Sequence, residues 1–468
     1  MKELRRNMRA VGVLVLALFI GAGAWFGFTV YTQGDAWAST AYNPRLAKTN
    51  SQRGDITDRD GVTLATTDED GKRVYMENAA ARRALSQTVG DTAGMSGAGV
   101  ESFFSATLLD LSTGLTDRLS EVFNDARHVG SSIQLTIDAQ LQAGIAKIFP
   151  KGYSGAVCVT NYRTGEILAM VSLPNYDPYS ANAAAEGVAD TAYLNRCLQG
   201  LYTPGSIFKI VTLACALDYD PNVVKQQFTC SSVWEYEGGS INCMSGRTAH
   251  GDLNLQGAFT RSCNVTFGKL AYQLGLDRLR ATAEKFGFNE NFKFGDFMVY
   301  NSSFPSSIRN MNGLVWAGIG QGEVLVTPLH MAMISGAVAN GGVMMQPYLV
   351  KEIKSSLGIV SRRGESKAYR QVMSVDAAKT IAKYMYQTVK SGTARRAAIS
   401  GYTVGGKTGS AEISDDKNVA TNAWYTGFVY DDAHPFAISV VIEGGGAGGN
   451  LASELAAGAL KLAIQTVN

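Results

Sequence analysis

Apolar residues form one long stretch near the N-terminus and several short runs later in the chain. The length and spacing of these stretches predict most of the fold. One uncharged stretch runs from Val11 to Tyr31. At about 1.5 Å per residue a helix of that length crosses a hydrocarbon core of about 30 Å. Much later, two apolar and β-branched runs, Gly155–Asn161 and Ile167–Leu173, flank the segment Arg163–Glu166. Runs of this kind on either side of a glycine-containing turn predict a β-hairpin.

The C-terminal third repeats this strand pattern. Two of its runs are joined by an Asp431-Asp432 turn, and an apolar stretch, Leu451–Val467, predicts a closing helix. Five strands, mostly linked as hairpins and with helices between the two groups, predict an α+β fold with an antiparallel sheet. The three C-terminal runs are Thr403–Glu412, Trp424–Tyr430 and Phe436–Glu443.

Between the first apolar stretch and the hairpin, residues 32–130 have a mixed composition rich in Ala, Gly and Asp. Helical patterns near Asn78–Thr88 and Leu115–Val122 predict a short pedestal domain, and the run Ile133–Asp138 begins the next domain. The predicted division is a tail at 1–10, an anchor at 11–31, a pedestal at 32–132 and a catalytic domain at 133–468.

The first 31 residues predict the topology. Positive charge ahead of the apolar stretch favours a cytoplasmic N-terminus, so the rest of the chain is expected outside the cell membrane. A cleaved signal peptide with its cut near Ala36–Ala38 is the alternative. The length and bulk of the stretch favour a retained single-pass anchor. Its preceding cations are Lys2, Arg5, Arg6 and Arg9.

Composition removes some classes of function. The 468 residues include 42 Lys and Arg against 40 Asp and Glu, for a net charge of +2. No basic stripe indicates a nucleic-acid partner.

The strongest chemical signal begins at Ser206. Pro204-Gly205 ends an extended segment, and the apolar run after Ser206 predicts a buried helix that starts there. Lys209 lies one turn further on the same face, where its amine can reach the hydroxyl. A serine becomes a good nucleophile when a neighbouring base takes its proton, and a buried lysine can be that base. The alternative is a serine cap followed by a solvated lysine.

Two later motifs supply the partners that such a serine needs. Ser262 and Asn264 are two residues apart, so both side chains can point the same way in a turn. The hydroxyl could pass a proton to a leaving amine, and the amide could hold the substrate and the lysine. The segment Lys407-Thr408-Gly409 follows two glycines and predicts an edge strand on which an extended peptide with a terminal carboxylate can lie.

In this combination and order, the three motifs resemble those of penicillin-binding proteins and serine β-lactamases. An upstream signature, Arg53–Ile56 with Asp58-Arg59 and Gly61, resembles that of class B penicillin-binding proteins, which are monofunctional cell-wall D,D-transpeptidases. Other segments that resemble the family are Asn195–Gln199 with Tyr202, Gly320–Gly322 with Thr327-Pro328, and Ser391–Ala394.

The resemblance implies a specific fold and reaction. The fold is a five-stranded sheet with helices on both faces. Ser206 attacks the penultimate D-Ala of a stem peptide, and backbone N–H groups of Ser206 and Ser410 form the oxyanion hole. Thr408, Gly409 and Ser410 bind the substrate, and β-lactams trap Ser206. No cofactor or metal is implied, and the expected partner is a polytopic glycan polymerase of the same membrane.

Other functions remain open at this stage. A β-lactamase or a D,D-carboxypeptidase would use the same motifs with water as the acceptor. A β-lactam sensor or an assembly scaffold would use acylation, if at all, as a signal.

The six cysteines form two groups. Three of them lie in apolar runs and are expected to be buried thiols. Cys230 and Cys243 lie 13 residues apart in a polar segment, and a disulfide between them is the leading expectation. Free thiols, or a zinc site that also uses His250 or Cys263, are the alternatives. The three in apolar runs are Cys158, Cys197 and Cys215.

Overall fold

The computed structural model describes residues 2–38, 52–110, 129–180, 190–243, 249–414, 416 and 419–467. Within the first helix, α1 (Lys2–Ala38), it describes the side chains of Asn7 and of residues 11–29. The predicted helix at Leu115–Val122 and the predicted cleavage position near Ala36–Ala38 lie outside the residues or side chains described.

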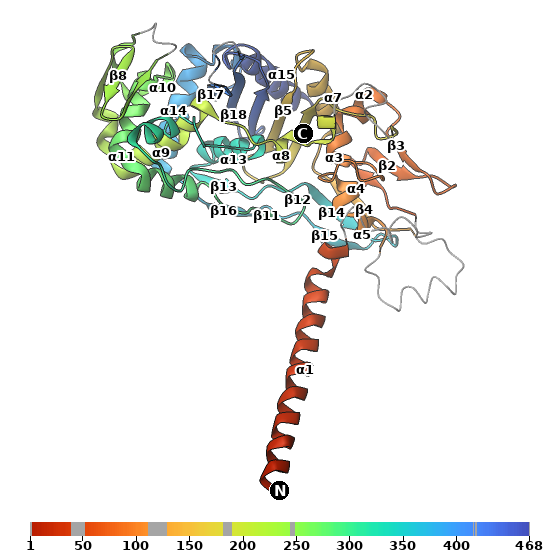
Figure 1. The fold of residues 1–468 in the computed structure, drawn as a ribbon. Helices are drawn as coiled ribbons and strands as arrows, with labels where there is room; N and C mark the ends of the chain where they lie inside the picture. Colours follow the sequence, from red (N-terminus) through yellow and green to blue (C-terminus); the bar gives the residue numbers. More distant parts are fainter. Residues whose placement is uncertain are drawn as a thin grey trace.

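A five-stranded antiparallel sheet forms the centre of the body (Figure 1), and its strands are the five that the apolar runs predict. The predicted fold class is confirmed. The order is β17-β18-β19-β5-β6, so β17 is an edge strand. The strands are β5 (Gly155–Asn161), β6 (Ile167–Leu173), β17 (Val404–Ala411), β18 (Asn422–Val429) and β19 (Phe436–Ile442).

Helices cover both faces of this sheet, which explains why β5, β6 and β19 are largely apolar instead of alternating. Along β5, Ala156 and Cys158 belong to the hydrophobic core that also contains α13 (Pro328–Ala339). The intervening Val157 and Val159 belong to a second core with α7 (Ala139–Ile148) and α15 (Leu451–Thr466). Burial of both faces removes the need for polar positions along the strand.

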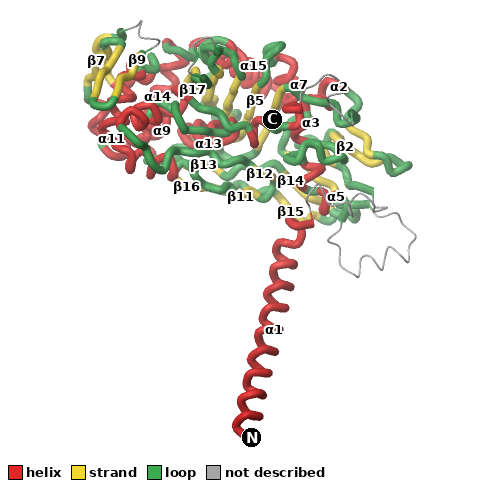
Figure 2. Tube along the Cα trace, in the orientation of Figure 1, coloured by secondary structure: helices red, strands yellow, loops and turns green. Residues whose placement is uncertain are grey.

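A helical region lies beside the β17 edge (Figure 2). It carries the second of the three motifs, Ser262-Cys263-Asn264, which is called the second motif below. Its helix α9 (Lys209–Tyr219) is buried along nearly its whole length and packs against α11 and α14. The other helices of the region are α10 (Leu255–Thr260), α11 (Asn264–Lys285), α12 (Met311–Ala317) and α14 (Val375–Ser391), and its short strands are β7 (Gln227–Cys230), β8 (Val233–Tyr236), β9 (Gly239–Asn242) and β10 (Gly251–Asn254).

A six-stranded sheet, in the order β15-β14-β4-β1-β2-β3, joins the pedestal to the rest of the body. β4 (Ser132–Leu135) pairs in parallel with β1 (Ile56–Thr57) and antiparallel with β14 (Val350–Lys354). Strands from far along the chain therefore complete the pedestal sheet, which extends across the predicted boundary at residue 133. Its remaining strands are β2 (Thr63–Thr67), β3 (Arg73–Tyr75) and β15 (Val360–Arg363).

The signature made of Arg53–Ile56, Asp58-Arg59 and Gly61 lies at this junction. Arg53 and Arg73 both pair with the buried carboxylate of Glu101, at 3.0 and 2.6 Å. Asp58 accepts the N–H groups of Asp60 and Val62, and its second oxygen accepts the N–H of the first residue of α7. The signature thus closes a turn and ties it to the catalytic side of the boundary.

Short elements complete the body. The pedestal contains α2 (Ala79–Ala84), α3 (Ser86–Val89), α4 (Val100–Phe103) and α5 (Ser105–Leu108), and the first two fall in the predicted pattern at Asn78–Thr88. The others are η3 (Asp190–Tyr193), α8 (Arg196–Gln199), η5 (Pro221–Lys225), β11 (Lys293–Phe294), β12 (Phe297–Met298), β13 (Val343–Met345), β16 (Ala368–Gln371) and η7 (Arg395–Ala397).

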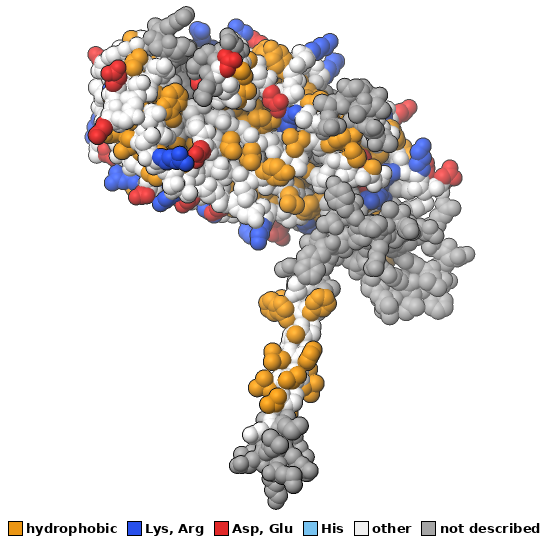
Figure 3. Space-filling view, in the orientation of Figure 1, with side chains coloured by type: hydrophobic (Ala, Val, Ile, Leu, Met, Phe, Trp, Pro, Cys, Tyr) orange, Lys and Arg blue, Asp and Glu red, His pale blue; other side chains and the backbone are white. Residues whose placement is uncertain are grey.

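Helix α1 stands apart from the body, and its side chains at 11–28 are exposed (Figures 1 and 3). The segment Val11–Thr29, 19 residues long, meets the length and composition needed to cross a membrane. It lies within the predicted anchor.

Candidate active site

The nucleophile candidate Ser206 lies in a tight turn, η4 (Gly205–Phe208), directly before α9. Gly205 has a φ of +57°, which glycine adopts readily, and its N–H donates to the carbonyl of Gly320 at 2.8 Å. The hydrogen bond to Gly320 therefore holds the turn against the motif Gly320–Gly322. A side chain on Gly320 would place Cβ 2.2 Å from the carbonyl oxygen of Gly205, so only glycine fits there.

Lys209 is fully buried and makes three polar contacts, all with the second motif. Its Nζ lies 2.8 Å from the carbonyl oxygen of Ser262, 3.3 Å from the Ser262 hydroxyl and 2.7 Å from Oδ1 of Asn264. Burial lowers the pKa of Lys209 to about 8, because the charged amine loses its hydration. A lysine in this state can exchange a proton near neutral pH.

Ser262 occupies a left-handed conformation with a φ of +56°. Few non-glycine residues adopt this region, and they persist where their surroundings hold them. Its backbone N–H donates to Phe259, and Cys263, which caps α11, follows immediately. The conformation directs both the carbonyl and the hydroxyl of Ser262 at Lys209.

Lys407 reaches the same hydroxyl from the opposite side. It is buried on the edge strand β17, and its Nζ lies 2.8 Å from Oγ of Ser262 and 2.9 Å from the Thr408 carbonyl oxygen. Burial first, and then the nearby charge of Lys209, lower the pKa of Lys407 well below its usual value. Strand β17 also packs closely against the segment that precedes Ser206. Gly409 permits this contact, because a Cβ there would come within 2.8 Å of the Pro204 carbonyl oxygen.

Thr393 is a site residue to which the sequence assigned no role. Its hydroxyl lies 2.7 Å from that of Thr408, and both residues line the cleft described next. The resemblance singled out the stretch Ser391–Ala394, but only the fold places this loop beside β17.

The three motifs meet along one open cleft with a volume of about 530 Å³, a size typical of ligand-binding sites. Ser206, Ser262, Asn264 and the substrate-binding candidates of β17 line it. Three arginines also line it, and they give its rim positive charge. The lining thus includes Thr408, Gly409, Ser410, Arg261, Arg395 and Arg396.

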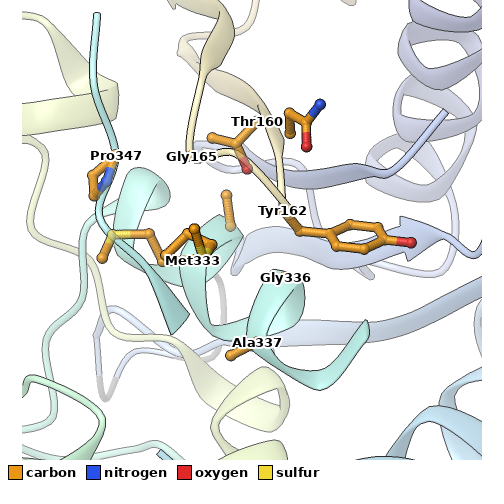
Figure 4. Close-up of a pocket in the computed structure, with 10 residues that line it drawn as sticks. Thr160, Tyr162, Gly165, Met333, Gly336, Ala337 and Pro347 are labelled. Atoms are coloured by element: carbon orange, nitrogen blue, oxygen red, sulfur yellow. The ribbon is translucent and has the colours of Figure 1, made fainter. Parts of the chain in front are cut away.

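A second pocket, between the β5–β6 turn and α13, offers no comparable site (Figure 4). Thr160, Tyr162, Met333 and Pro347 are among its lining residues, and at about 10 Å³ it has room for about one water molecule. The three-motif cleft is therefore the candidate active site.

The segment just before Ser206, which contains Arg196, Tyr202 and Thr203, is held in place by contacts with the central sheet. The Tyr202 hydroxyl donates to Glu443 at 2.7 Å, and Arg196 pairs with the same carboxylate at 2.8 Å. The indole N–H of Trp424 donates to the Thr203 carbonyl at 3.1 Å. These contacts anchor the chain just before Ser206 to strand β18 and to the end of β19.

All six cysteines lie in described parts of the chain, and all six are free thiols. The sulfur atoms of Cys230 and Cys243 are 3.6 Å apart, whereas a disulfide bond is about 2.05 Å long. The structure therefore does not contain the expected disulfide. It instead gathers these two cysteines with His250 and Cys263 directly behind the second motif.

Fold and site together define a serine acyl-transfer enzyme. A family model described as "Penicillin binding protein transpeptidase domain" matches residues 155–461. The chain belongs to the penicillin-binding protein transpeptidase family, as its motifs predicted.

Named relatives agree. The chain is 29% identical to a peptidoglycan D,D-transpeptidase PbpA of Mycolicibacterium smegmatis, over 99% of both chains. Penicillin-binding protein A from M. tuberculosis, solved as a ceftriaxone acyl-enzyme, is 28% identical with a TM-score of 0.81, over 90% of this chain and all of that one. A D,D-transpeptidase domain from Eggerthella lenta is 30% identical with a TM-score of 0.76, over 89% of this chain and 99% of that one. The predictions of a class B penicillin-binding protein and of a D,D-transpeptidase enzyme are confirmed.

Proposed function

We propose that this chain cross-links peptidoglycan through an acyl-enzyme on Ser206, and that β-lactams inhibit it by acylating the same hydroxyl. The observation that carries the proposal is the hydrogen-bonded cluster of Lys209, Ser262, Asn264 and Lys407 beside the turn that holds Ser206.

Acylation would use Lys209 as the base. The neutral amine takes the proton of the Ser206 hydroxyl while Oγ bonds to the carbonyl carbon of the penultimate D-Ala. The N–H groups of Ser206 and Ser410, two residues that line the cleft, would stabilise the negative charge that develops on the carbonyl oxygen.

Departure of the terminal D-Ala would use the second motif. When the carbon–nitrogen bond breaks, the leaving amine needs a proton. The Ser262 hydroxyl can pass it one from the two lysines that are hydrogen-bonded to it. The amine of a second stem peptide then attacks the ester. A new amide bond forms, and Ser206 regains its proton.

The β17 edge would position both peptide substrate and β-lactam. An extended peptide adds to a free strand edge through backbone hydrogen bonds. Thr393 and Thr408 line the cleft, where their hydroxyls would meet the terminal carboxylate, and the buried Lys407 would add positive charge behind them. The arginine rim raises the local concentration of such anionic ends.

The location follows from α1. We propose that α1 is a single-pass anchor with a cytoplasmic N-terminus, and that residues 32–132 form a pedestal beneath an extracytoplasmic catalytic domain at 133–468. The charge ahead of the apolar segment supports this topology. A polytopic glycan polymerase in the same membrane is the proposed partner, because cross-linking requires newly made glycan strands.

Intact-protein mass spectrometry with a β-lactam, followed over time, tests the proposal. The full chain in detergent should gain one β-lactam mass, located on Ser206, and Ser206→Ala should gain none. Ser391→Ala, an exposed-face control on α14, should label as the wild type does. Labelling at another serine in Ser206→Ala would refute the assignment.

The same time course separates transpeptidation from β-lactam hydrolysis. A β-lactamase needs a general base that hydrolyses the acyl-enzyme, and Glu412 is the one carboxylate among the described residues lining the cleft. We expect a long-lived adduct, with the same lifetime in Glu412→Gln. Rapid release of hydrolysed β-lactam that Glu412→Gln slows would instead identify a β-lactamase.

A further inference from the structure

Three cysteines and a histidine converge behind the second motif from four separate elements. Cys230 ends β7 and Cys243 follows β9, and His250 directly precedes Gly251, the β10 residue that pairs with Cys230. Cys263 caps α11 between the two residues of the second motif. The three thiols are buried and the histidine is half-buried. None of these side chains takes part in the proposed acyl transfer.

Three distances within this group match those between the ligands of one tetrahedral ion. The Cys230–Cys243 sulfur atoms are 3.6 Å apart, those of Cys243 and Cys263 are 3.5 Å apart, and Cys230 lies 3.5 Å from Nδ1 of His250. All four ligand atoms lie within 4.8 Å of one another. A zinc ion with bonds of about 2.3 Å to sulfur and about 2.0 Å to nitrogen places its ligands about 3.5 to 3.8 Å apart.

Hydrogen bonds around the sulfurs also suit metal-bound thiolates. The N–H groups of Asn264 and Val265 point to the Cys243 sulfur, at 3.1 and 3.5 Å. The N–H and hydroxyl of Thr266 point to the Cys263 sulfur, at 3.4 and 3.3 Å. These donors form the first turn of α11, whose positive end favours negative sulfur. Outer hydrogen bonds of this kind orient and stabilise metal ligands.

We propose that Cys230, Cys243, His250 and Cys263 bind one structural zinc ion that holds the second motif in place. Four protein ligands fill the coordination sphere, so the ion serves structure and not catalysis.

Chain connectivity links this ion to the active site. Cys263 is bonded directly to Ser262 and to Asn264, and those two residues supply all three polar contacts of Lys209. Ser262 keeps an unfavourable φ of +56°, which its surroundings must maintain. An ion that fixes Cys263 to β7, β9 and the start of β10 would supply that restraint.

A disulfide explains the same group less well. Two of the sulfur pairs are almost equally close, so neither pair is selected, and a bond between either would leave the third thiol and the histidine without a function. Zinc uses all four and would also protect the thiols in an oxidising compartment.

The first test measures metal in the full chain, purified in detergent without chelators or reducing agents. Elemental mass spectrometry should find about one zinc per chain. Cys230→Ala and His250→Ala should each lower zinc affinity at least about tenfold in competition with a chelator. Cys215→Ala is the matched control, because it removes a buried thiol on α9 outside the group and should retain zinc.

His250→Ala keeps the test decisive if the cysteine variant fails to fold, because His250 is half-buried and lies outside the strands. A wild type without stoichiometric metal would overturn the proposal, whether its thiols are free or joined in a disulfide. Equal zinc affinity in His250→Ala and the wild type would overturn the ligand assignment.

A second test addresses the link to the active site. Removing zinc from the full chain with a chelator should slow acylation by a β-lactam about tenfold or more, and added zinc, but not magnesium, should restore it. Equal acylation rates with and without zinc would overturn the proposed restraint of the second motif. Metal content is measured without acylation, so this result is separate from any failure of the proposed reaction.

Discussion

Lys209 and Lys407 share one acceptor, since their Nζ atoms lie 3.3 and 2.8 Å from the hydroxyl oxygen of Ser262. Both amines are fully buried, so two positive charges at this distance would each lack hydration and repel the other. The arrangement favours one neutral amine. Because Lys209 contacts Asn264 and lies one turn from Ser206, it is the amine that would accept the serine proton.

Acylation should therefore depend on pH through Lys209. The pKa of Lys209 is lowered to about 8, and only the neutral amine can accept a proton. The second-order rate of β-lactam acylation should rise about tenfold per pH unit below that pKa and level off above it. Stopped-flow or quenched mass spectrometry from pH 6 to 9.5 measures this profile.

Lys209→Ala provides the control for that profile. General-base catalysis contributes about 10²- to 10⁴-fold, so the variant should acylate slower by that factor and without the rise towards pH 8. An unchanged profile in Lys209→Ala would assign the titration to another group, with Lys407 as the nearest alternative.

Substitutions at Gly320 and Gly322 can distinguish the effect of a steric clash from the effect of an unfavourable φ. Gly320 and Gly322 have similar φ values of +78° and +71°, but only Gly320 lacks room for a Cβ. Gly322→Ala should cost about 1 kcal/mol from its positive φ and leave acylation nearly unchanged. Gly320→Ala must also displace the Gly205 carbonyl, so acylation should fall more than about tenfold because Ser206 moves with it.

Thermal unfolding and β-lactam labelling of the two variants make the comparison. If both variants acylate like the wild type, the contact between Gly320 and Gly205 does not position the nucleophile.

Prediction from sequence succeeded where the signal was local. The strands at Gly155–Asn161 and Ile167–Leu173 are continuous apolar runs because both sheet faces are covered, and such runs are visible without a structure. The pairing of β4 with β14 cannot be predicted in this way, because it joins residues more than 200 positions apart. Thr393 was missed for the same reason, since its partner Thr408 comes near only through the fold.

The cysteines show a different limit. Spacing of Cys230 and Cys243 along the chain suggested a pair, but sequence distance does not show which other side chains lie beside the two sulfur atoms. The sequence named His250 and Cys263 only as optional partners in a zinc site, and the structure shows that both lie beside Cys230 and Cys243.

His330 should make stability depend on pH. It is buried in α13, where Nε2 donates to the Phe286 carbonyl at 2.9 Å and Nδ1 accepts from Ser302 at 2.8 Å. Burial lowers its pKa to about 4, against about 6.5 in the unfolded chain. The unfolded state binds more protons in this window, so the stabilisation is present above about pH 6.5 and is lost as the pH falls towards 4.

His330→Gln keeps one donor and one acceptor but does not titrate. Its melting temperature should be lower than that of the wild type at pH 7.5, and the difference should shrink at pH 5. His434→Gln changes a histidine outside the core and is the control. A difference that stays constant between pH 7.5 and 5 would contradict the assignment of this pH dependence to His330.

The last prediction concerns the proposed polymerase partner and the anchor. Gly23 and Gly27 are four residues apart on α1, so they share one helix face, and nothing in the described chain lies within 4 Å of where their Cβ atoms would be. Small residues at this spacing let a second membrane helix approach closely, although glycine is also frequent in membrane helices without any partner.

Replacing both glycines with leucine should weaken co-purification with a polytopic glycan polymerase in detergent, because the added bulk separates the two helices. Acylation by a β-lactam should not change, since no residue of α1 lines the cleft. Gly21→Leu adds the same bulk on the opposite helix face and should co-purify like the wild type. If the double variant co-purifies equally well, the contact must lie elsewhere, and the pedestal surface around Arg53–Gly61 becomes the next region to alter.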